Sequence, residues 1–500
     1  MHTFGSRAAT RPALGRLTGM KLERRAFLKL AGATVAGAAA TACSAAPPAQ
    51  APSSAPGTPL PPSTSVTPPS GPPDWAALRN KVSLLLPGDS GYDNAKRVFN
   101  PAFDGLNPAA LAKCAKPEDV QAAVSAAARR VPIAARSGGH SYAGYSVPDG
   151  GLMIDLGEMS SVDVQGDRVV IGAGAKLKDV YATLGGSGRC LPAGSCPSVG
   201  IAGLTLGGGI GVLARKYGLT CDHLVSARIV TADGQLRTAS ADSEPELFWA
   251  LRGGGGGNFG VVTSFTFRTD PAPPVVSVFS LHFPAGSADD VVAEWQRWLP
   301  GAPPELWANV VLSGGSPVGV RVSGCHVGDS ASLGKILDGF TGGTRSVKQL
   351  DYLGAMKYFS GGESRQSFVA SSRILSKPVE PAKLTSVLRG RRGMDLLVDG
   401  LGGAVADLAP DATAFWHRKA LGSVQIYGQA DAGNRSAATD SVAEVVTGLG
   451  LGGGYVNYID PALPDWMTAY YGGNATRLKQ VAKTYDPDKV FGFAQAVTPD

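Results

Sequence analysis

Three absences narrow the classes of protein to which this sequence can belong. It has no convincing membrane span, because its most apolar segment, Leu30 to Ala42, is short and rich in Ala and Gly. It has no internal repeat, since its 67 glycines follow no period, and this excludes collagen-like and repeat architectures. Its six cysteines form no CxxC pair, so we predict no zinc site and no other metal site.

The chain also lacks an excess of basic residues outside its N-terminus, although its formal net charge is +6. Residues 1–42 hold seven of the 46 Lys and Arg and one of the 40 Asp and Glu, which leaves 39 basic and 39 acidic side chains. The rest of the chain is therefore formally neutral. A basic patch of the kind that binds nucleic acid is not predicted, and we expect no nucleic-acid partner.

The first 42 residues resemble an export signal. Arg24 and Arg25 precede the small apolar segment, an order typical of signals for the twin-arginine route, which carries folded proteins. We expect this signal peptide to direct the protein out of the cell or to the outer face of the membrane. Export in the folded state suits an enzyme that collects a cofactor in the cytoplasm.

Residues 43–73 have the composition of an extended, disordered spacer. They are rich in Pro, Ser, Thr and Ala and carry no charge before Asp74. Cys43 roughly fits a lipid-attachment motif, although Ala40 stands where Leu is usual. A lipid-anchored and a soluble secreted protein both remain open, and a lipid on Cys43 would be the sole membrane contact. Of the other cysteines, export permits disulfides, but buried free thiols are the simpler expectation.

The chain after the spacer is long enough for two domains. Residues 74–272 contain helical starts and short strand-like segments, which predict an α+β domain of two small sheets; the expected helices begin at Trp75 and Pro117, and the strands include residues 131–135, 152–156 and 168–172. Composition changes at Pro271 to Pro274. Residues 273–454 predict an α/β layer with an antiparallel sheet, with strands at 275–283, 307–312, 319–327 and 423–429 and a helix at 289–299. Residues 455–500 are expected to return to the first domain.

Two glycine-rich segments carry nucleophilic side chains. Residues 136–141, Arg-Ser-Gly-Gly-His-Ser, follow a predicted strand, and residues 194–200, Gly-Ser-Cys-Pro-Ser-Val-Gly, precede a second run of small residues. Glycines allow backbone N–H groups to converge on a pyrophosphate and a flat ring to lie against the main chain. A Gly-Gly pair alone is equally typical of a plain turn. The presence of both His140 and Cys196 favours a flavin that is attached twice.

With these motifs in this order, the chain is identified as resembling the berberine bridge enzyme-like FAD-linked oxidases of the vanillyl-alcohol oxidase superfamily. The resemblance extends from about Asn100 to the C-terminus and includes Arg215 to Asp222, Asn258 to Val262, Tyr455 to Tyr458 and Tyr485 to Phe491. It implies a two-subdomain PCMH-type FAD-binding domain, with FAD between the two subdomains, and a substrate domain that roofs the flavin. It also implies a covalent bond from His140 to the flavin 8α carbon and one from Cys196 to ring carbon 6.

The resemblance implies a larger set of residues that bind FAD. These are Arg136, Ser137, Gly138, Gly139, His140, Ser141, Cys196, Val199, Gly200, Gly203, Gly207, Gly208, Gly211, Gly260, Val261, Val262 and Asn457. The run Gly253 to Gly257 superficially resembles a dinucleotide fingerprint. It lacks the strand, turn, helix and downstream acid of that motif, so we do not predict nicotinamide binding.

The oxidation of an alcohol needs a group that removes the hydroxyl proton. The resemblance points to Tyr455, provided that its pKa is lowered near the flavin, whereas simple packing is the alternative role for Tyr455 and Tyr458. Gln425 and Tyr427 alternate on one face of their predicted strand and would line the substrate pocket. His417 is expected to brace the structure, and Trp416 stands where the family usually has Pro, which puts the local turn in doubt.

Three functions remain open at this point. The favoured one is an exported FAD-dependent oxidase that uses O2, releases H2O2 and oxidises a hydroxyl of a sugar, an oligosaccharide or a secondary metabolite. The second is a flavin dehydrogenase that passes electrons to another acceptor. The third is a non-catalytic surface lipoprotein that kept the fold as a binding module, against which the presence of His140 and Cys196 argues. Neither the substrate nor the oligomeric state follows from the sequence.

Overall fold

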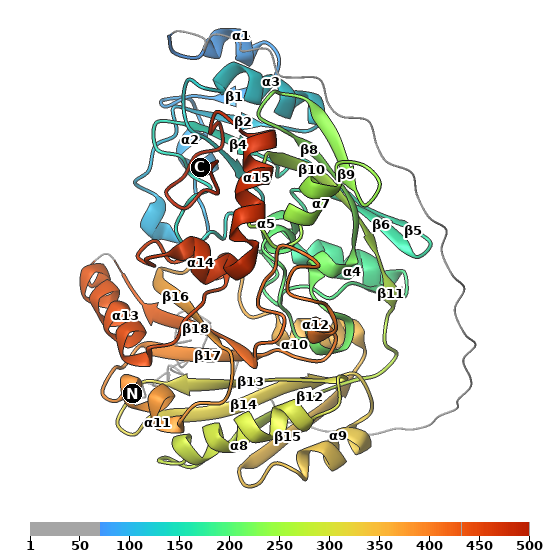
Figure 1. Ribbon diagram of the computed structural model, residues 1–500, viewed down its shortest axis with the longest axis vertical. Coiled ribbons are helices and arrows are strands. Elements are labelled where there is room, and N and C mark those ends of the chain that lie inside the picture. The colour runs from blue at the N-terminus through green and yellow to red at the C-terminus, as the bar shows by residue number, and fades with distance from the viewer. Residues whose placement is uncertain (1–70, 432, 500) are drawn as a thin grey trace, which may run out of the picture.

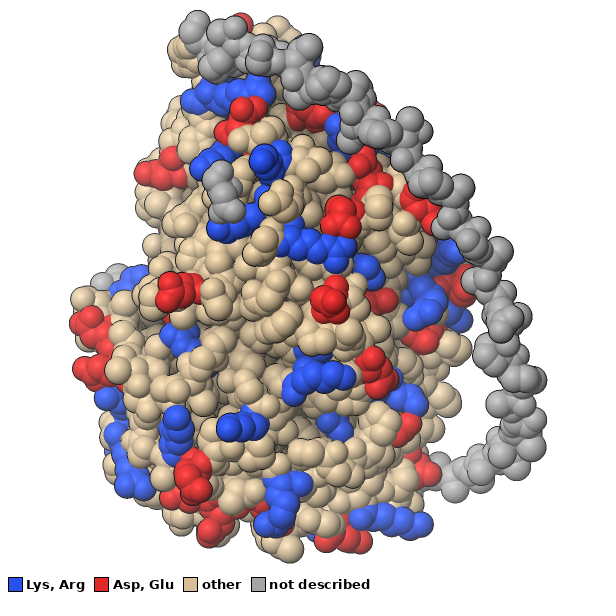
Figure 2. All heavy atoms as spheres, in the orientation of Figure 1, with Lys and Arg blue, Asp and Glu red and all other residues tan. Residues whose placement is uncertain are grey.

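The computed structural model describes residues 71–431 and 433–499. The predicted signal peptide, Cys43 and nearly all of the predicted spacer lie outside these residues. No helix within the described ranges is long and apolar enough to cross a membrane. Figure 2 shows basic and acidic side chains intermixed over one face of the molecule, without a patch of one sign.

Two small sheets and a two-stranded ribbon occupy the first half of the described chain. The four-stranded sheet is mixed, with the order β1 (Ser83–Leu85), β2 (Ala110–Lys113), β4 (Leu152–Asp155), β3 (Ile133–Arg136). The five-stranded sheet is antiparallel, with the order β5 (Val162–Gln165), β6 (Arg168–Gly172), β10 (Val261–Arg268), β8 (Leu224–Val230), β9 (Leu236–Ser240). The ribbon pairs β7 (Arg189–Cys190) with β11 (Asp270–Pro271).

Short helices join these strands and pack on them (Figure 1). They are α1 (Trp75–Arg79), α2 (Tyr92–Ala95), α3 (Pro117–Ala127), α4 (Leu177–Gly186), α5 (Ile201–Leu206), α6 (Ala214–Tyr217) and α7 (Pro245–Ala250), with 3-10 turns η2 (Pro101–Phe103) and η3 (Thr220–His223). Helix α3 begins as the sequence predicts. Its first turn has Pro117 and the acids Glu118 and Asp119, and the Asp119 carboxylate accepts the N–H of Lys116.

A seven-stranded antiparallel sheet forms the other layer, below the small sheets in Figure 1. Its order is β15 (Thr344–Leu350), β12 (Val276–His282), β14 (Gly319–His326), β13 (Leu306–Ser313), β17 (Met394–Gly400), β18 (Gly422–Gln429), β16 (Phe368–Leu375). The associated helices are α8 (Ala288–Gly301), α9 (Ser330–Leu337), α10 (Tyr352–Phe359), α11 (Pro381–Thr385), α12 (Ala404–Asp407) and α13 (Arg435–Leu449), with the 3-10 turn η4 (Ser386–Leu388).

The two faces of this sheet differ because side chains alternate along each strand. One face is apolar and packs against α8, α9, α11 and α13. The core between them includes Val310, Leu396 and Ile426 from the strands and Trp295 from α8. The opposite face turns toward the small sheets and carries polar residues, among them Asn309, Asp395, Asp399, Gln425 and Tyr427. The alternation therefore supplies a hydrophobic core on one side and a polar cavity wall on the other.

The C-terminal residues lie against the first half of the chain. Past η5 (Val456–Tyr458) they form α14 (Trp466–Tyr471), η6 (Gly472–Asn474) and α15 (Ala475–Tyr485), and α15 lies beside α7 (Figure 1). Arg477 on α15 pairs with Glu246 on α7 at 2.7 Å. Further along, the N–H of Val497 donates to Asn258 Oδ1 at 2.9 Å. These bonds hold the C-terminal residues against the first half of the chain.

The elements named from the sequence are present, with ends that differ by a few residues. The predicted strands correspond to β3, β4, β6, β12, β13, β14 and β18, and the predicted helices to α1, α3 and α8. Four cysteines are buried free thiols, as expected: Cys114, Cys190, Cys221 and Cys325. Burial raises the pKa of Cys190 and of Cys325 to about 12, which keeps these thiols protonated and unreactive at neutral pH.

His417 braces the loop before β18. Its Nε2 donates to the carbonyl oxygen of Ala469 at 3.0 Å, and burial lowers the pKa of His417 to about 4. The unfolded value is near 6.5, so the unfolded chain binds the proton more tightly. The stability that the neutral ring supplies is thus complete above about pH 6.5 and is lost as the pH falls through about 4.

We expect His417 to contribute to acid unfolding. The full loss over this window is at most about 3 kcal/mol, by the pKa difference. Urea unfolding of the wild-type protein and of His417→Gln, which keeps an N–H donor without the titration, should be compared at about pH 7 and about pH 4.5. The wild type should lose about 2 kcal/mol more than the variant. Equal losses would show that folding does not lower the pKa of His417.

Candidate active site

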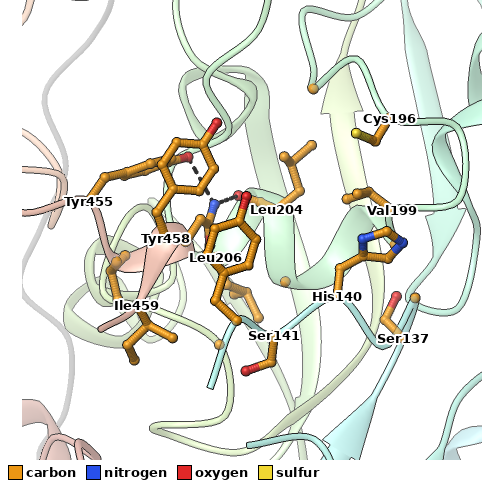
Figure 3. A pocket seen from close by; sticks show the side chains of 18 of the residues that line it. Ser137, His140, Ser141, Cys196, Val199, Leu204, Leu206, Tyr455, Tyr458 and Ile459 are labelled. Atoms are coloured by element: carbon orange, nitrogen blue, oxygen red, sulfur yellow. Dashed lines mark hydrogen bonds between the residues drawn. The ribbon is translucent and has the colours of Figure 1, made fainter. Parts of the chain in front are cut away.

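One cavity of about 410 Å³ lies between the small sheets and the polar face of the seven-stranded sheet. The glycine-rich segments supply one side of it, and strands β13, β17 and β18 and the turn η5 supply the other. Figure 3 shows His140 and Cys196 on one side and Tyr455 and Tyr458 across from them. The two nucleophiles and the proposed base therefore face one space, although they are far apart in the sequence.

The loop after β3 and the loop before α5 touch through their backbones. A Cβ on Gly138 would lie 2.2 Å from the Gly200 nitrogen, and a Cβ on Gly200 would lie 2.1 Å from Ser137 Oγ. Only glycine permits this approach, because at either position the Cβ of any other residue would collide with the facing loop. Ser137 Oγ also donates to the Ala173 carbonyl oxygen at 2.6 Å, which anchors the first loop to the residue after β6.

His140 is held on its ring face and on its edge. The Phe99 ring stacks on it with centroids 4.0 Å apart and an interplanar angle of 21°. The ring nitrogen Nε2 lies 3.0 Å from the hydroxyl oxygen of Ser198, which belongs to the Cys196 loop. A polar contact thus links the two nucleophile-bearing loops, and Ser198 is a residue that the sequence interpretation did not single out.

Cys196 differs from the other described cysteines because it is partly exposed and lines the cavity. The remaining four are buried, and their thiols have raised pKa values. A thiol that reacts must reach its electrophile and form a thiolate, and both are difficult for a buried sulfur. Cys196 is the described cysteine whose surroundings suit covalent chemistry.

The Tyr455 oxygen accepts three N–H hydrogen bonds. The donors are the backbone N–H of Gly209 at 3.0 Å and of Ile210 at 3.2 Å, and Nδ2 of Asn457 at 2.9 Å. Burial nevertheless raises the pKa of Tyr455 to about 12, so the protein surroundings alone do not supply the lowered pKa that was the condition for its role as a base. The three donors oppose that effect, and the equally enclosed Tyr181 and Tyr471 have pKa values raised still further.

Asn457 lines the cavity, but both of its amide N–H groups donate to acceptors within the protein. Nδ2 donates to the Leu204 carbonyl oxygen at 2.9 Å as well as to Tyr455, which uses both of its hydrogens. The structure thus gives Asn457 a role in fixing the Tyr455 oxygen. Its predicted contact with the cofactor stays a prediction.

Gln425 and Tyr427 lie on the cavity face of β18, as their alternation predicts. Gln425 Nε2 donates to the Tyr142 hydroxyl, and the Tyr427 hydroxyl donates to Gln366 Oε1 at 3.3 Å. The Tyr142 ring stacks on Tyr458 with centroids 5.2 Å apart. The wall therefore combines amide and hydroxyl groups with aromatic faces.

Three residues predicted to bind the cofactor do not line the cavity. Arg136 turns away, because its guanidinium pairs with Asp155 at 2.6 Å and donates to the carbonyl oxygens of Ala95 and Arg97. Gly207 and Gly208 pack against protein side chains instead: a Cβ on Gly207 would lie 2.1 Å from Asn457 Oδ1, and one on Gly208 would lie 2.8 Å from the Phe415 ring. The lack of a side chain at these two positions permits close packing against the protein, and their predicted contact with the cofactor stays a prediction.

The other predicted residues do line the cavity. They are Ser137, Gly138, Gly139, His140, Ser141, Cys196, Val199, Gly200, Gly203, Gly211, Gly260, Val261, Val262, Tyr455 and Asn457, together with Gln425 and Tyr427. Their placement brings segments from residues 137 to 457 around one space.

Sequence reasoning missed two groups of lining residues. Gly255 to Gly257 border the cavity. They belong to the glycine run 253–257, which follows helix α7 and precedes strand β10, whereas a dinucleotide-binding turn follows a strand and precedes a helix. The unbroken run of five glycines could have indicated a second cradle. The carboxylates of Asp395 and Asp399 also line the wall, and their alternation in β17 was the available signal.

Comparisons with known proteins agree with this arrangement. A family model described as an FAD binding domain matches residues 108–240, and one described as berberine and berberine like matches residues 454–498. An uncharacterised FAD-linked oxidoreductase of Bacillus subtilis is 35% identical over 83% of this chain and 96% of its own. The chain belongs to the berberine bridge enzyme-like family of FAD-linked oxidoreductases.

Other relatives support the same family and fold. The xylooligosaccharide oxidase of Thermothelomyces thermophilus is 31% identical over 84% of this chain and 93% of its own. The solved structure of glucooligosaccharide oxidase from Acremonium strictum has a TM-score of 0.79 and 27% identity, and it covers 85% of this chain and 99% of its own. The predicted family, the α+β fold class with its PCMH-type flavoprotein architecture, and the assignment as an FAD-dependent oxidoreductase are confirmed.

The cavity of this oxidoreductase fits FAD in the chemistry of its walls. His140 and Cys196 offer two nucleophiles, and bare backbone is exposed at Gly203, where an added Cβ would meet no atom within 4 Å and would enter the open space. A Cβ on Gly256, from the facing loop, would come no closer than 3.7 Å to Gly203. A flat ring system can therefore lie on main chain at this point.

Proposed function

We propose that the protein is an exported oxidase with FAD bonded to both His140 and Cys196, which oxidises a hydroxyl of a sugar or oligosaccharide and reduces O2 to H2O2. The observation that carries the proposal is the Tyr455 oxygen, held by three N–H donors on the wall opposite the two nucleophiles. Bound FAD would accept a hydride from the substrate carbon. The protein must then take up the hydroxyl proton.

Tyr455 is the residue suited to that proton transfer. A phenolate oxygen that accepts three hydrogen bonds is stabilised where it forms, in the manner of an oxyanion hole. Its raised pKa means that the phenol form dominates at neutral pH and that the phenolate is a strong base when it forms. Asn457 and the backbone at Gly209 and Ile210 supply the donors.

The cavity wall supports a substrate rich in hydroxyl groups. Carboxylates and amides of Asp395, Asp399, Asn309 and Gln425 accept or donate hydrogen bonds, and the stacked rings of Tyr142 and Tyr458 offer an apolar face. Relatives with names that state a substrate include xylooligosaccharide, chitooligosaccharide and glucooligosaccharide oxidases. A sugar is therefore favoured over a wholly apolar secondary metabolite.

The double attachment has support from a structural neighbour. The solved glucooligosaccharide oxidase of Acremonium strictum is described as having a 6-S-cysteinyl, 8α-N1-histidyl FAD. In the present chain His140 and Cys196 lie on the same side of one cavity, as two bonds to one ring system require. Two bonds would prevent loss of the cofactor and would raise its reduction potential.

A sugar screen with a peroxide readout tests the reaction. The purified holoenzyme is offered neutral mono- and oligosaccharides in air, and H2O2 and consumed O2 are measured together. Equal amounts of H2O2 and oxidised product would support the oxidase. Rapid turnover with a quinone or dye but none with O2 would identify a dehydrogenase, and failure to bleach the flavin with any sugar would overturn the substrate class.

Export and anchoring are tested separately. Expression in a host with a twin-arginine system should release a protein shortened by the leader, and Arg24→Lys with Arg25→Lys should keep it in the cytoplasm. Detergent partitioning and mass spectrometry of the N-terminal peptide distinguish a lipid on Cys43 from a soluble secreted form. If the unaltered protein instead stayed unprocessed in the cytoplasm, that result would contradict export.

A further inference from the structure

Ser198 makes a contact with His140 that neither the family motifs nor the proposed reaction requires. The Ser198 hydroxyl oxygen lies 3.0 Å from Nε2 of the imidazole. Ser198 comes two residues after Cys196, so the bond joins the loop that carries one nucleophile to the side chain of the other. The hydroxyl is thus placed to influence how His140 reacts.

The backbone on either side of Ser198 is fixed by the start of helix α4. The N–H of Lys178 donates to the Pro197 carbonyl oxygen at 3.0 Å, and the N–H of Leu177 donates to that of Val199 at 2.9 Å. The Ser198 carbonyl oxygen would also lie 2.8 Å from a Cβ on Gly138. The backbone that carries Ser198 is therefore held in place by hydrogen bonds on both sides.

The imidazole is fixed from the other side. The Phe99 ring covers one of its faces, and the N–H of Phe99 donates to the Gly139 carbonyl oxygen at 3.0 Å. A Cβ on Gly139 would lie 3.2 Å from the Val98 side chain, so this loop also packs closely. The ring is therefore held both by stacking on Phe99 and by the contact of Nε2 with Ser198.

A neutral imidazole carries its hydrogen on one nitrogen and its lone pair on the other. If the Ser198 oxygen accepts a hydrogen bond from Nε2–H, the lone pair belongs to Nδ1, and Nδ1 is the nucleophile. If the Ser198 hydroxyl instead donated to Nε2, Nδ1 would carry the hydrogen and could not attack. The direction of one hydrogen bond thus decides which nitrogen is reactive.

We propose that Ser198 is a positioning residue for flavin attachment: it holds His140 with the hydrogen on Nε2 and directs bond formation to Nδ1. The inference rests on the proposed covalent FAD. In the step, Nδ1 forms a bond to the 8α carbon, one C–H bond of the 8α methyl and the imidazole N–H are lost, and both hydrogens with two electrons reduce the flavin. O2, the oxidant of the proposed function, then takes them up as H2O2 and restores the oxidised flavin.

Ser198→Ala removes the hydroxyl, and Ser198→Gly removes it in a second way should the first variant fold poorly. Ser198→Thr keeps a hydroxyl and serves as the conservative rescue. Ser187→Ala makes the same change at an exposed position, where the hydroxyl donates to the Thr183 carbonyl oxygen at the end of its own helix. Each protein is made in a riboflavin-limited host and mixed with FAD, and thermal melting checks the fold.

Two readouts follow the reaction. Mass spectrometry of digests gives the rate at which flavin appears on the His140 peptide and on the Cys196 peptide. Acid hydrolysis then releases the histidyl flavin, whose Nδ1 and Nε2 isomers separate by chromatography. A residue with a general structural role would slow both peptides alike, whereas a residue that fixes the imidazole acts on His140 and on the choice of isomer.

We expect the hydroxyl-free variants to attach flavin to His140 about tenfold more slowly and to yield some Nε2 isomer, with attachment to Cys196 retained. Ser198→Thr and Ser187→Ala should match the wild type. An unchanged rate and isomer in both hydroxyl-free variants, or equal loss at both peptides, would overturn the role of Ser198 and leave the double attachment intact. A wild-type His140 peptide without flavin would overturn the double attachment itself, and this inference with it.

Discussion

Tyr455→Phe should lower kcat by about 10²–10⁴-fold, the usual contribution of a positioned acid or base. The phenol oxygen is the group that receives three N–H donors at the cavity wall, and no hydroxyl remains in the variant. The aromatic ring is kept, so its edge contacts with Phe415 and Tyr458 persist. Stopped-flow bleaching of the flavin by the sugar substrate measures the loss on the reductive step directly.

Tyr458→Phe is the matched control. Tyr458 lies 5.0 Å from Tyr455, ring to ring, and lines the same cavity, but its hydroxyl is not the one cradled by the backbone at Gly209 and Ile210. Its loss of rate should be far smaller. Equal losses in the two variants, or a Tyr455→Phe enzyme that keeps more than about half of the wild-type rate, would remove Tyr455 from the proton transfer.

The pH dependence of the reductive rate tests the same role of Tyr455. Because burial raises the pKa of Tyr455 to about 12, the phenolate fraction at lower pH grows about tenfold for each unit by which the pH rises. The reductive rate of the wild type should therefore rise with pH across the neutral and mildly alkaline range. The residual rate of Tyr455→Phe should lack that rise.

Arg215→Met should lower the free energy of unfolding by about 3–5 kcal/mol. Arg215 comes from α6, in the first half of the chain, and its side chain is buried. Its guanidinium donates to four carbonyl oxygens around the seven-stranded sheet: those of Leu299, Ala302, Leu306 and Leu401. The variant would leave these acceptors buried and unsatisfied, and each carries a desolvation cost.

Lys216→Met makes the same change one residue later. Lys216 pairs with Glu305 at 2.6 Å, but both side chains are about one-third exposed, so this pair should contribute at most about 1 kcal/mol. Urea unfolding of both variants and the wild type measures the difference. An Arg215→Met protein within about 1 kcal/mol of the wild type would show that water or rearranged donors satisfy the four carbonyl groups.

The sequence predicts the elements of the fold well where one periodicity dominates. Strand β18 alternates apolar and polar side chains, and α3 carries Pro and acids at its start, so local pattern and final structure agree. The order of strands in the seven-stranded sheet is different in kind. It depends on long-range pairing, such as that of β13 with β17, which no local pattern specifies.

For the site, the types of residue were predictable and their surroundings were not. His140 and Cys196 stand out as nucleophiles in glycine-rich loops, but the contact between Ser198 and His140 requires the two loops to be in place. The same holds for Arg136, because its guanidinium forms an ion pair with Asp155 on the neighbouring strand β4. The pKa of Tyr455 is likewise a balance of burial against three donors and can be judged only in three dimensions.

The most direct test of the double attachment is acid precipitation of the purified protein, followed by mass spectrometry of the peptides that contain His140 and Cys196. We predict a yellow precipitate, a colourless supernatant and the mass of flavin on both peptides, joined through one cofactor. Flavin released into the supernatant, with both peptides at their unmodified mass, would contradict the double attachment and leave a non-covalent FAD enzyme.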